Sequence, residues 1–137
     1  MRDFVPPPDF LRFVELFNRG EFWESHEALE GAWRVSRSRF YHGMILLASA
    51  YVHVGRGNAK GVAAQLRKAL RELPDHRPAY LGVDVAGLVE LAEAALASLE
   101  SGSRAPLGGQ LPAVALALDP RRVRGDEPEL GETERRL

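Results

Sequence analysis

The chain has 137 residues, of which 45% are hydrophobic and 27% are charged, and this size suits one compact core. Its 18 basic and 19 acidic residues give a formal net charge of -1, so it lacks the positive field of a general nucleic-acid binder. The absence of cysteine excludes disulfides, thiol nucleophiles and zinc fingers.

The longest apolar stretch, Gly43 to Val54, is too short to span a bilayer. The N-terminus has no apolar segment of the kind that secretory signals carry. We therefore expect a cytoplasmic protein with no membrane partner.

The hydrophobic periodicity predicts five helices and no strand, which makes the fold class all-α. After an extended lead-in at residues 1–8, Asp9 is expected to cap a first helix that ends near Gly20. A second helix follows over about residues 21–34. The third, residues 39–55, is apolar nearly all round and should be the central, most buried helix of the bundle.

Two further caps, Asn58 and Asp84, predict helices to about Leu73 and to about Glu100. Residues 9–101 then form the helical bundle domain, and residues 102–137 form an irregular extension that ends in a charged tail. This tail, residues 119–137, is too polar to fold alone, so it should lie on its own body or on a neighbouring subunit. For that reason we predict a homo-oligomer, with a dimer favoured.

The second helix carries the densest group of chemically useful side chains. Trp33 lies on its core face, and His26 and Glu30 share a flank one turn apart. Glu24 and Glu27 lie further round, towards solvent or another helix. These residues define a polar centre for ligand binding.

The third helix adds a polar stripe of His42, Ser49 and His53 on an otherwise apolar cylinder. If the second and third helices run antiparallel, Glu30 should face His42, and His26 should reach Ser49. His42 and His53 are about 16 Å apart along the helix axis, which excludes one metal site that uses all three histidines.

Two interpretations of this cluster stay open. In the first, His26 and Glu30 are metal ligands at i and i+4, His42 is a third ligand, and Glu27 is a catalytic base in a metal-dependent hydrolase-like enzyme. In the second, which we favour, the carboxylates accept hydrogen bonds from the histidines or from backbone amides and tie the helices together. A divalent metal is therefore a candidate cofactor only in the first case.

The segment Phe17-Asn18-x-Gly20-x-Phe22-Trp23-Glu24-x-His26-Glu27-x-Leu29-Glu30-x-x-Trp33, with His53-x-x-x-Gly57-Asn58 after it, resembles the family called domain of unknown function 309. The resemblance covers about residues 10–100 and implies a small, all-helical, soluble protein with no established activity. It maps the family motif onto Glu24, His26, Glu27, Glu30, Trp33, His53, Gly57 and Asn58. The family pattern has glutamine before Gly43, where this chain has His42, so the third ligand would not be general in the family.

A second, shorter resemblance concerns residues 57–74. The Gly57-Asn58-x-x-Gly61 stretch and Leu70-x-x-Leu73-Pro74 look like half of a tetratricopeptide unit, although no 34-residue period recurs. Peptide binding in the groove between the third and fourth helices is the weakest of our functional hypotheses.

The sequence thus favours a binding or interaction module around a partly buried His/Glu cluster, with a small-molecule or protein partner of undetermined identity. We expect any ligand or metal near His26, Glu27 and Glu30. The alternative location is the basic face of the fourth helix, formed by Lys60, Arg67, Lys68 and Arg71, which offers only charge.

Overall fold

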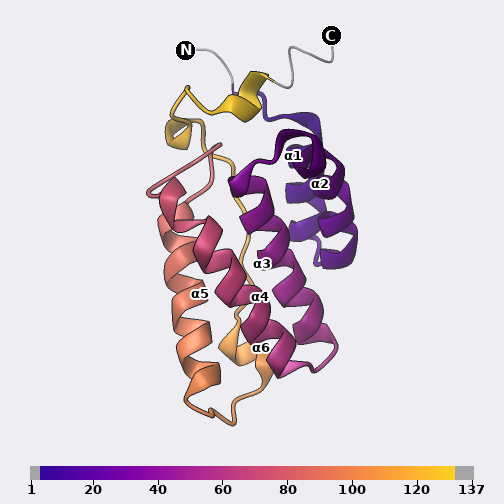
Figure 1. Ribbon diagram of the computed structural model, residues 1–137, viewed down its shortest axis with the longest axis vertical. Coiled ribbons are helices and arrows are strands. Elements are labelled where there is room, and N and C mark those ends of the chain that lie inside the picture. The colour runs from indigo at the N-terminus through magenta and orange to yellow at the C-terminus, as the bar shows by residue number, and fades with distance from the viewer. Residues whose placement is uncertain (1–3, 132–137) are drawn as a thin grey trace.

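The computed structural model describes residues 4–131. These residues form six α-helices and three short 3₁₀ turns, with no strand, which confirms the all-α prediction. The helices are α1 Pro8–Asn18, α2 Phe22–Ser36, α3 Arg39–Gly55, α4 Ala59–Glu72, α5 Val85–Glu100 and the single-turn α6 Leu107–Gln110. The 3₁₀ turns are η1 Pro74–His76, η2 Pro120–Arg122 and η3 Pro128–Leu130. In Figure 1, helices α3, α4 and α5 run antiparallel, and each of the five long helices packs against the next.

The helix ends follow the local chemistry, with one exception. Ser38, Asn58 and Asp84 each accept a hydrogen bond from a backbone N–H in the first turn of α3, α4 and α5. The expected cap Asp9 instead lies inside α1, because Pro8 occupies the first helical position and Pro7 stands before it. At the other end of α2, Arg37 adopts a left-handed conformation, φ 57°, and stops the helix.

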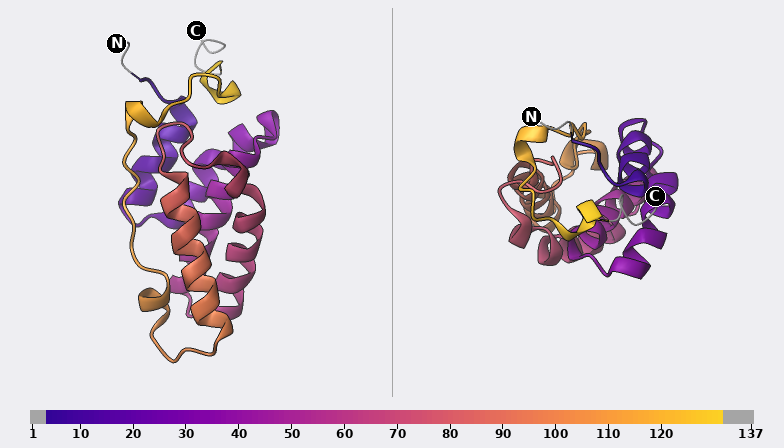
Figure 2. Two further views of the ribbon diagram at one scale, coloured as in Figure 1. Left: turned by 90° about the vertical axis from the view of Figure 1, so that its left-hand side faces the viewer. Right: turned by 90° about the horizontal axis from the view of Figure 1, so that it is seen from above.

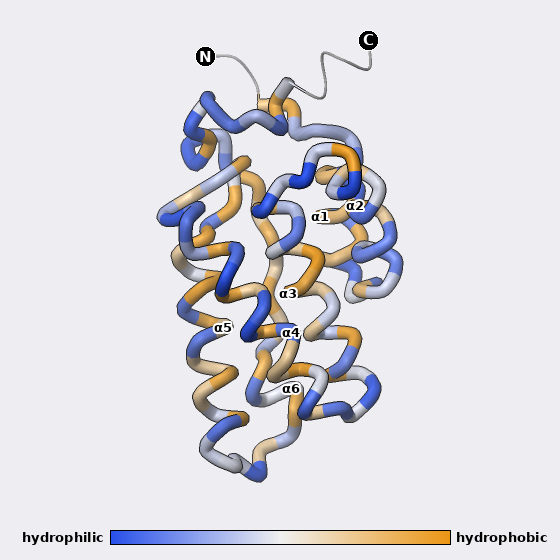
Figure 3. Tube along the Cα trace, in the orientation of Figure 1, coloured by the Kyte–Doolittle hydropathy of each residue, from blue (hydrophilic) through white to orange (hydrophobic). Residues whose placement is uncertain are grey.

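Helix α3 is the central helix, as its composition predicts. Its fully buried residues are Phe40, Tyr41, Met44, Leu47, Ala48 and Ala50, each 0% exposed. Helix α2 covers one side and α4 the other. Gly43 permits the close approach of α4, because a Cβ atom there would lie 2.6 Å from Leu73 Cδ2. In Figure 3, much of the α3 trace has the colour of hydrophobic residues.

Residues 111–119, here called the C-terminal strap, run in extended form along the open side of the helical array between α1 and α5 (Figures 1 and 2). The strap is fixed at three points. Tyr51 of α3 donates a hydrogen bond to the Pro112 carbonyl. The Asn18 side chain both donates to the Leu116 carbonyl and accepts from the Leu116 N–H. The Asp119 N–H donates to the Gly82 carbonyl at 2.9 Å.

The charged tail, as far as residue 131, packs against its own chain through hydrogen bonds to Ser38, Tyr80 and Leu81. Two of its carboxylates, Glu127 and Glu129, are only 3% and 5% exposed. Residues 132–137 of the predicted tail and residues 1–3 of the predicted lead-in fall outside the described residues. Within residues 4–131, no helix has the length and apolar character needed to cross a membrane.

Candidate functional site

Helix α2 separates its polar side chains into two groups. Ser25, Leu29 and Ala32 are buried on its core face, and the Ser25 hydroxyl donates to the Phe22 carbonyl at 2.8 Å. His26 and Glu30 are half-buried beside this face, whereas Glu24 and Glu27 are exposed. The polar centre that the sequence predicts is therefore not one cluster but two distinct surfaces of α2.

In the half-buried group, which consists of His26 and Glu30, the histidine stacks on Trp23. The rings of Trp23 and His26 lie nearly parallel, 10° apart, with centroids separated by 5.4 Å. His26 Nδ1 is 3.9 Å from Glu30 Oε2, and Glu30 in turn accepts a hydrogen bond from Arg34 at 2.5 Å. Among the residues that the structure describes, His26 Nδ1 is buried and has no hydrogen-bond partner. The pair His26 and Glu30 is thus brought together at i and i+4, as expected.

A second stack of the same composition joins α2 to α3 and α4. Trp33 and His42 lie 4.5 Å apart by ring centroids, with planes 9° apart. His42 Nδ1 is 3.4 Å from Glu72 Oε2, and the same oxygen is 3.6 Å from Arg39 Nε. Each stack therefore runs in the order tryptophan, histidine, glutamate, arginine.

The second stack corrects the expected contact between Glu30 and His42, which is not formed within residues 4–131. Glu30 turns towards Arg34, one turn ahead on its own helix, and α4 supplies Glu72 to His42. The expectation compared only α2 with α3. A partner from a third helix lay outside that comparison.

The predicted metal ligands are likewise divided between the two stacks. His26 and Glu30 belong to the first and His42 to the second. In the described part of the chain, no group of three histidine, aspartate or glutamate side chains is arranged to hold a metal ion. Glu27, the proposed base of that hypothesis, is exposed and lines the groove between α1 and α2.

His53 and Asn58 lie away from both stacks, at the junction of α3 and α4. Asn58 Nδ2 is 3.2 Å from His53 Nδ1, and Asn58 Oδ1 accepts the Gly61 N–H at 3.0 Å. A Cβ atom on Gly61 would lie 2.5 Å from His53 Nδ1, so a glycine is needed there. His53, Asn58 and Gly61 thus shape a helix junction. Ser49 lies between His42 and His53 in α3 and is half-buried, and no hydrogen bond in residues 4–131 joins it to His26.

The exposed group of α2 lines an open groove against α1. The groove is bounded by Arg12, Leu16, Arg19, Glu21, Trp23, Glu24, Glu27 and Ala28. Trp23 is 50% exposed, and the Arg56 guanidinium lies 5.9 Å from the centre of its ring. Arg12 and Arg19 each pair with a glutamate at 3.9 Å, namely Glu15 and Glu21. Neither Glu24 nor Glu27 forms an ion pair within residues 4–131.

Sequence reasoning missed a buried polar site at the opposite end of the chain. Glu129 accepts hydrogen bonds from Ser38 at 2.7 Å and from Tyr80 at 2.6 Å. Glu127 accepts three backbone N–H groups, those of Leu81, Arg124 and Gly125. Burial, and then the hydrogen bond to Glu129, raise the pKa of Tyr80 well above its ordinary value. A charged tail gave no local signal that two of its carboxylates would be buried.

Comparison with known proteins agrees with this architecture. Residues 10–65 match the family described as Domain of unknown function (DUF309). The chain is also 33% identical over 101 residues to the uncharacterized protein YpuF of Bacillus subtilis (strain 168). That alignment covers 69% of this chain and 57% of the relative, so the chain spans little more than half of the relative's length. Residues 10–65, which match the family, contain both tryptophan-histidine ring pairs and the α1–α2 groove.

Proposed function

We propose that this chain, which belongs to the DUF309 family through residues 10–65, is a binding module that takes a cationic side chain of a partner protein in the α1–α2 groove. The observation that carries the proposal is the half-exposed Trp23 beside two carboxylates, Glu24 and Glu27, that form no ion pair in residues 4–131.

The aromatic wall of the groove is suited to a cation. A tryptophan face attracts ammonium and guanidinium groups, and the Arg56 guanidinium already lies 5.9 Å from the Trp23 ring. Half-exposed tryptophans are also enriched at protein interfaces, because a large apolar surface is buried there at little entropic cost. Trp23 is thus available to contact a ligand.

The charge of the groove complements the same ligand. Arg12 and Arg19 are offset by Glu15 and Glu21, which leaves the charges of Glu24 and Glu27 uncompensated. The two carboxylates are three residues apart on α2, so they lie on neighbouring positions of its surface. An arginine or lysine side chain that enters the groove would meet the tryptophan face and both carboxylates.

The two stacks support this surface from behind. His26 packs against Trp23, and Glu30 with Arg34 lies beside His26. The Trp33–His42 stack ties the following turns of α2 to α3. A recognition surface needs such a rigid base, because side chains that are already ordered lose less entropy on binding.

The other functional hypotheses have less support. A metal-dependent hydrolase would need His26, Glu30 and His42 together, and the two stacks hold them apart. Peptide binding between α3 and α4 would need a groove where Gly43 packs on Leu73 and Gly61 packs on His53. Homo-oligomerisation and a cytoplasmic location stay predictions. The tail no longer argues for a dimer as far as residue 131, because its two buried carboxylates, Glu127 and Glu129, are hydrogen-bonded within the same chain.

The proposal is tested by titrating the full chain with the peptide Ac-Gly-Arg-Gly-Arg-Gly-NH2 and following the indole N–H signals by NMR. The chain has two tryptophans, so a Trp33→Phe variant assigns the Trp23 signal. We expect the Trp23 signal to shift and the Trp33 signal to stay. Glu24→Gln or Glu27→Gln should weaken binding up to about fivefold, as expected for one exposed ion pair.

Glu93→Gln is the matched control, because Glu93 is exposed on α5, away from the groove. It should leave the affinity unchanged. Binding that is equal in all three glutamine variants, or no shift at Trp23 at any peptide concentration, would rule out the groove as a cation site.

A further inference from the structure

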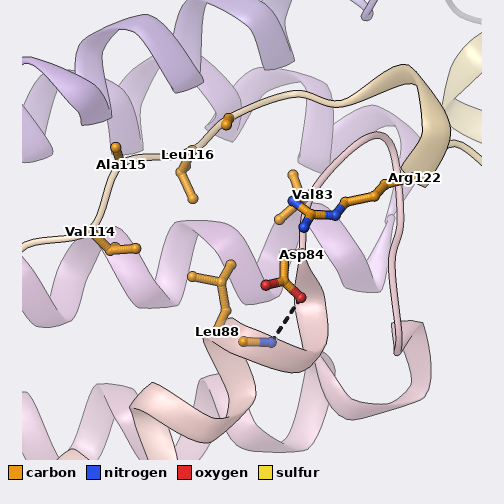
Figure 4. A pocket seen from close by; sticks show the side chains of 9 residues that line it. Val83, Asp84, Leu88, Val114, Ala115, Leu116 and Arg122 are labelled. Atoms are coloured by element: carbon orange, nitrogen blue, oxygen red, sulfur yellow. Dashed lines mark hydrogen bonds between the residues drawn. The ribbon is translucent and has the colours of Figure 1, made fainter.

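A second hollow lies between the C-terminal strap and the first turns of α5. It has a volume of about 230 Å³ and is walled by the apolar side chains of Val83, Leu88, Val114 and Leu116. Figure 4 shows these side chains on either side of the hollow, with Asp84 and Arg122 at one end. Pockets for whole small ligands measure roughly 300–1,000 Å³, so this one suits a single aliphatic side chain.

The strap presents one edge of its extended backbone to this hollow. At its C-terminal end, Asp119 has extended dihedral angles, φ -103° and ψ 119°. The burial alternates accordingly, because Leu116 is buried and both of its neighbours are exposed. In such a backbone, the N–H and C=O groups of successive residues point to opposite edges.

Three hydrogen bonds establish which edge of the strap faces which helix. The N–H and C=O of Leu116 bond to Asn18 at the end of α1, so even-numbered residues direct their backbone groups towards α1. The N–H of Asp119 bonds to Gly82 in the loop before α5, so odd-numbered residues direct theirs towards α5. Ala115 and Ala117 therefore offer their backbone groups to the hollow, whose lining includes both residues.

This edge is open. Ala115 and Ala117 are exposed, and within residues 4–131 neither makes a backbone hydrogen bond to the rest of the chain. Two aligned N–H and C=O pairs with no protein partner form a template for an added strand. The same spacing of two residues is what an incoming extended peptide requires.

The charged groups beside the hollow are also available. The Arg122 guanidinium has no ion-pair partner in the described part of the chain, whereas its neighbour Arg121 is paired with Asp119 at 2.9 Å. Asp84 uses Oδ1 to cap α5 by accepting the Gly87 N–H at 3.0 Å. The unpaired arginine is thus the group at this site that can attract a charged ligand.

From these contacts we infer that the strap and α5 form a peptide-binding site, distinct from the α1–α2 groove. The ligand is an extended segment of a partner protein that adds as a strand to Ala115 and Ala117. It places one aliphatic side chain between Leu88 and Leu116 and one acidic side chain on Arg122. The backbone pairing provides affinity, and the hollow and the arginine select the sequence.

The test is an NMR titration of the ¹⁵N-labelled full chain with the peptide Ac-Val-Glu-Leu-Val-Ala-NH2. We expect the amide signals of Ala115 and Ala117 to shift and their hydrogen exchange to slow, because both become hydrogen-bonded. Two further peptides of the same sequence carry N-methyl groups at alternate residues, one at the odd and one at the even positions. Only the peptide whose methyl groups block the N–H groups that pair with the strap should lose binding. Equal binding of both N-methylated peptides would overturn strand addition.

Ala117→Pro removes one donor from the edge without changing an extended backbone, and should weaken binding about three- to tenfold. Ala113→Pro is the matched control, since Ala113 lies on the same strap but outside the hollow. Arg122→Gln should weaken the acidic peptide and leave its glutamine analogue unaffected. Shifts centred on Trp23 instead of the strap, or no shifts at all, would overturn the inference. The α1–α2 groove is tested separately, with the arginine-containing peptide.

Discussion

The indole ring of Trp33 lies flat against the imidazole ring of His42, with centroids 4.5 Å apart and planes 9° apart. Glu72 of α4 holds the same imidazole from another direction, at 3.4 Å from Nδ1. Three consecutive helices therefore meet at one histidine side chain. Arg37 adds a cation 5.4 Å from the indole centre, at the point where α2 ends.

Trp33→Ala should therefore lower the free energy of unfolding by about 2–4 kcal/mol, because a half-buried ring and its stack are both lost. Trp33→Phe keeps an aromatic face and should lose less. Val35→Ala is the matched control on the same helix, because Val35 is 89% exposed and should change stability little. Urea denaturation measures all three. Equal stability of the alanine variants would show that the stack does not hold the helices together.

Two glycines should respond to alanine with opposite signs. A Cβ atom at Gly43 would lie 2.6 Å from Cδ2 of the fully buried Leu73, so Gly43→Ala should destabilise by about 1–3 kcal/mol. Gly31 in α2 has no atom within 4 Å of such a Cβ, so Gly31→Ala should stabilise by about 0.5–1 kcal/mol through helix propensity. Thermal or urea unfolding distinguishes them. Stabilisation by Gly43→Ala would contradict the close α3–α4 contact, and destabilisation by Gly31→Ala would contradict the propensity argument.

The sequence predicts the helices well because their signals are local. Asn58 and Asp84 cap the helices they were expected to cap, and the apolar surface of α3 requires a central position. These features depend on residues within one or two turns of each other. Composition and periodicity suffice for them.

The candidate site is less predictable because its pairings connect distant segments. His42 meets Glu72, thirty residues away in the chain, and a helix wheel of α2 and α3 contains no information about α4. Glu129 meets Ser38 and Tyr80, so its burial depends on where the strap places the tail. Charge density predicted only that this segment would not fold alone, and the hydrogen bonds that offset its burial could not be read from its composition.

Alkaline pH should weaken the attachment of the strap. Burial raises the pKa of the Tyr51 hydroxyl to about 12, and this hydroxyl donates to the Pro112 carbonyl. An unfolded tyrosine ionises near about pH 10, so the contribution of Tyr51 to stability is complete below that pH and is lost as the pH rises from about 10 to about 12. Urea midpoints across this range should fall, and should fall less steeply in Tyr51→Phe. An identical slope in both proteins would contradict the assignment to Tyr51.

Glu129 should be the side chain that holds the tail in place. It is 5% exposed and accepts the hydroxyl groups of both Ser38 and Tyr80. Glu129→Ala leaves these hydroxyls without their partner and should cost about 1–3 kcal/mol. Glu129→Gln keeps an acceptor for one hydroxyl and can donate to the other, so its loss should be smaller. Asp126→Asn, at an exposed position of the same tail, serves as the control.

Hydrogen exchange locates the effect, because faster exchange confined to residues 120–131 would mean that the tail opens while the helices stay folded. A loss below about half a kilocalorie per mole in Glu129→Ala, with unchanged exchange in the tail, would show that these two hydrogen bonds do not hold it.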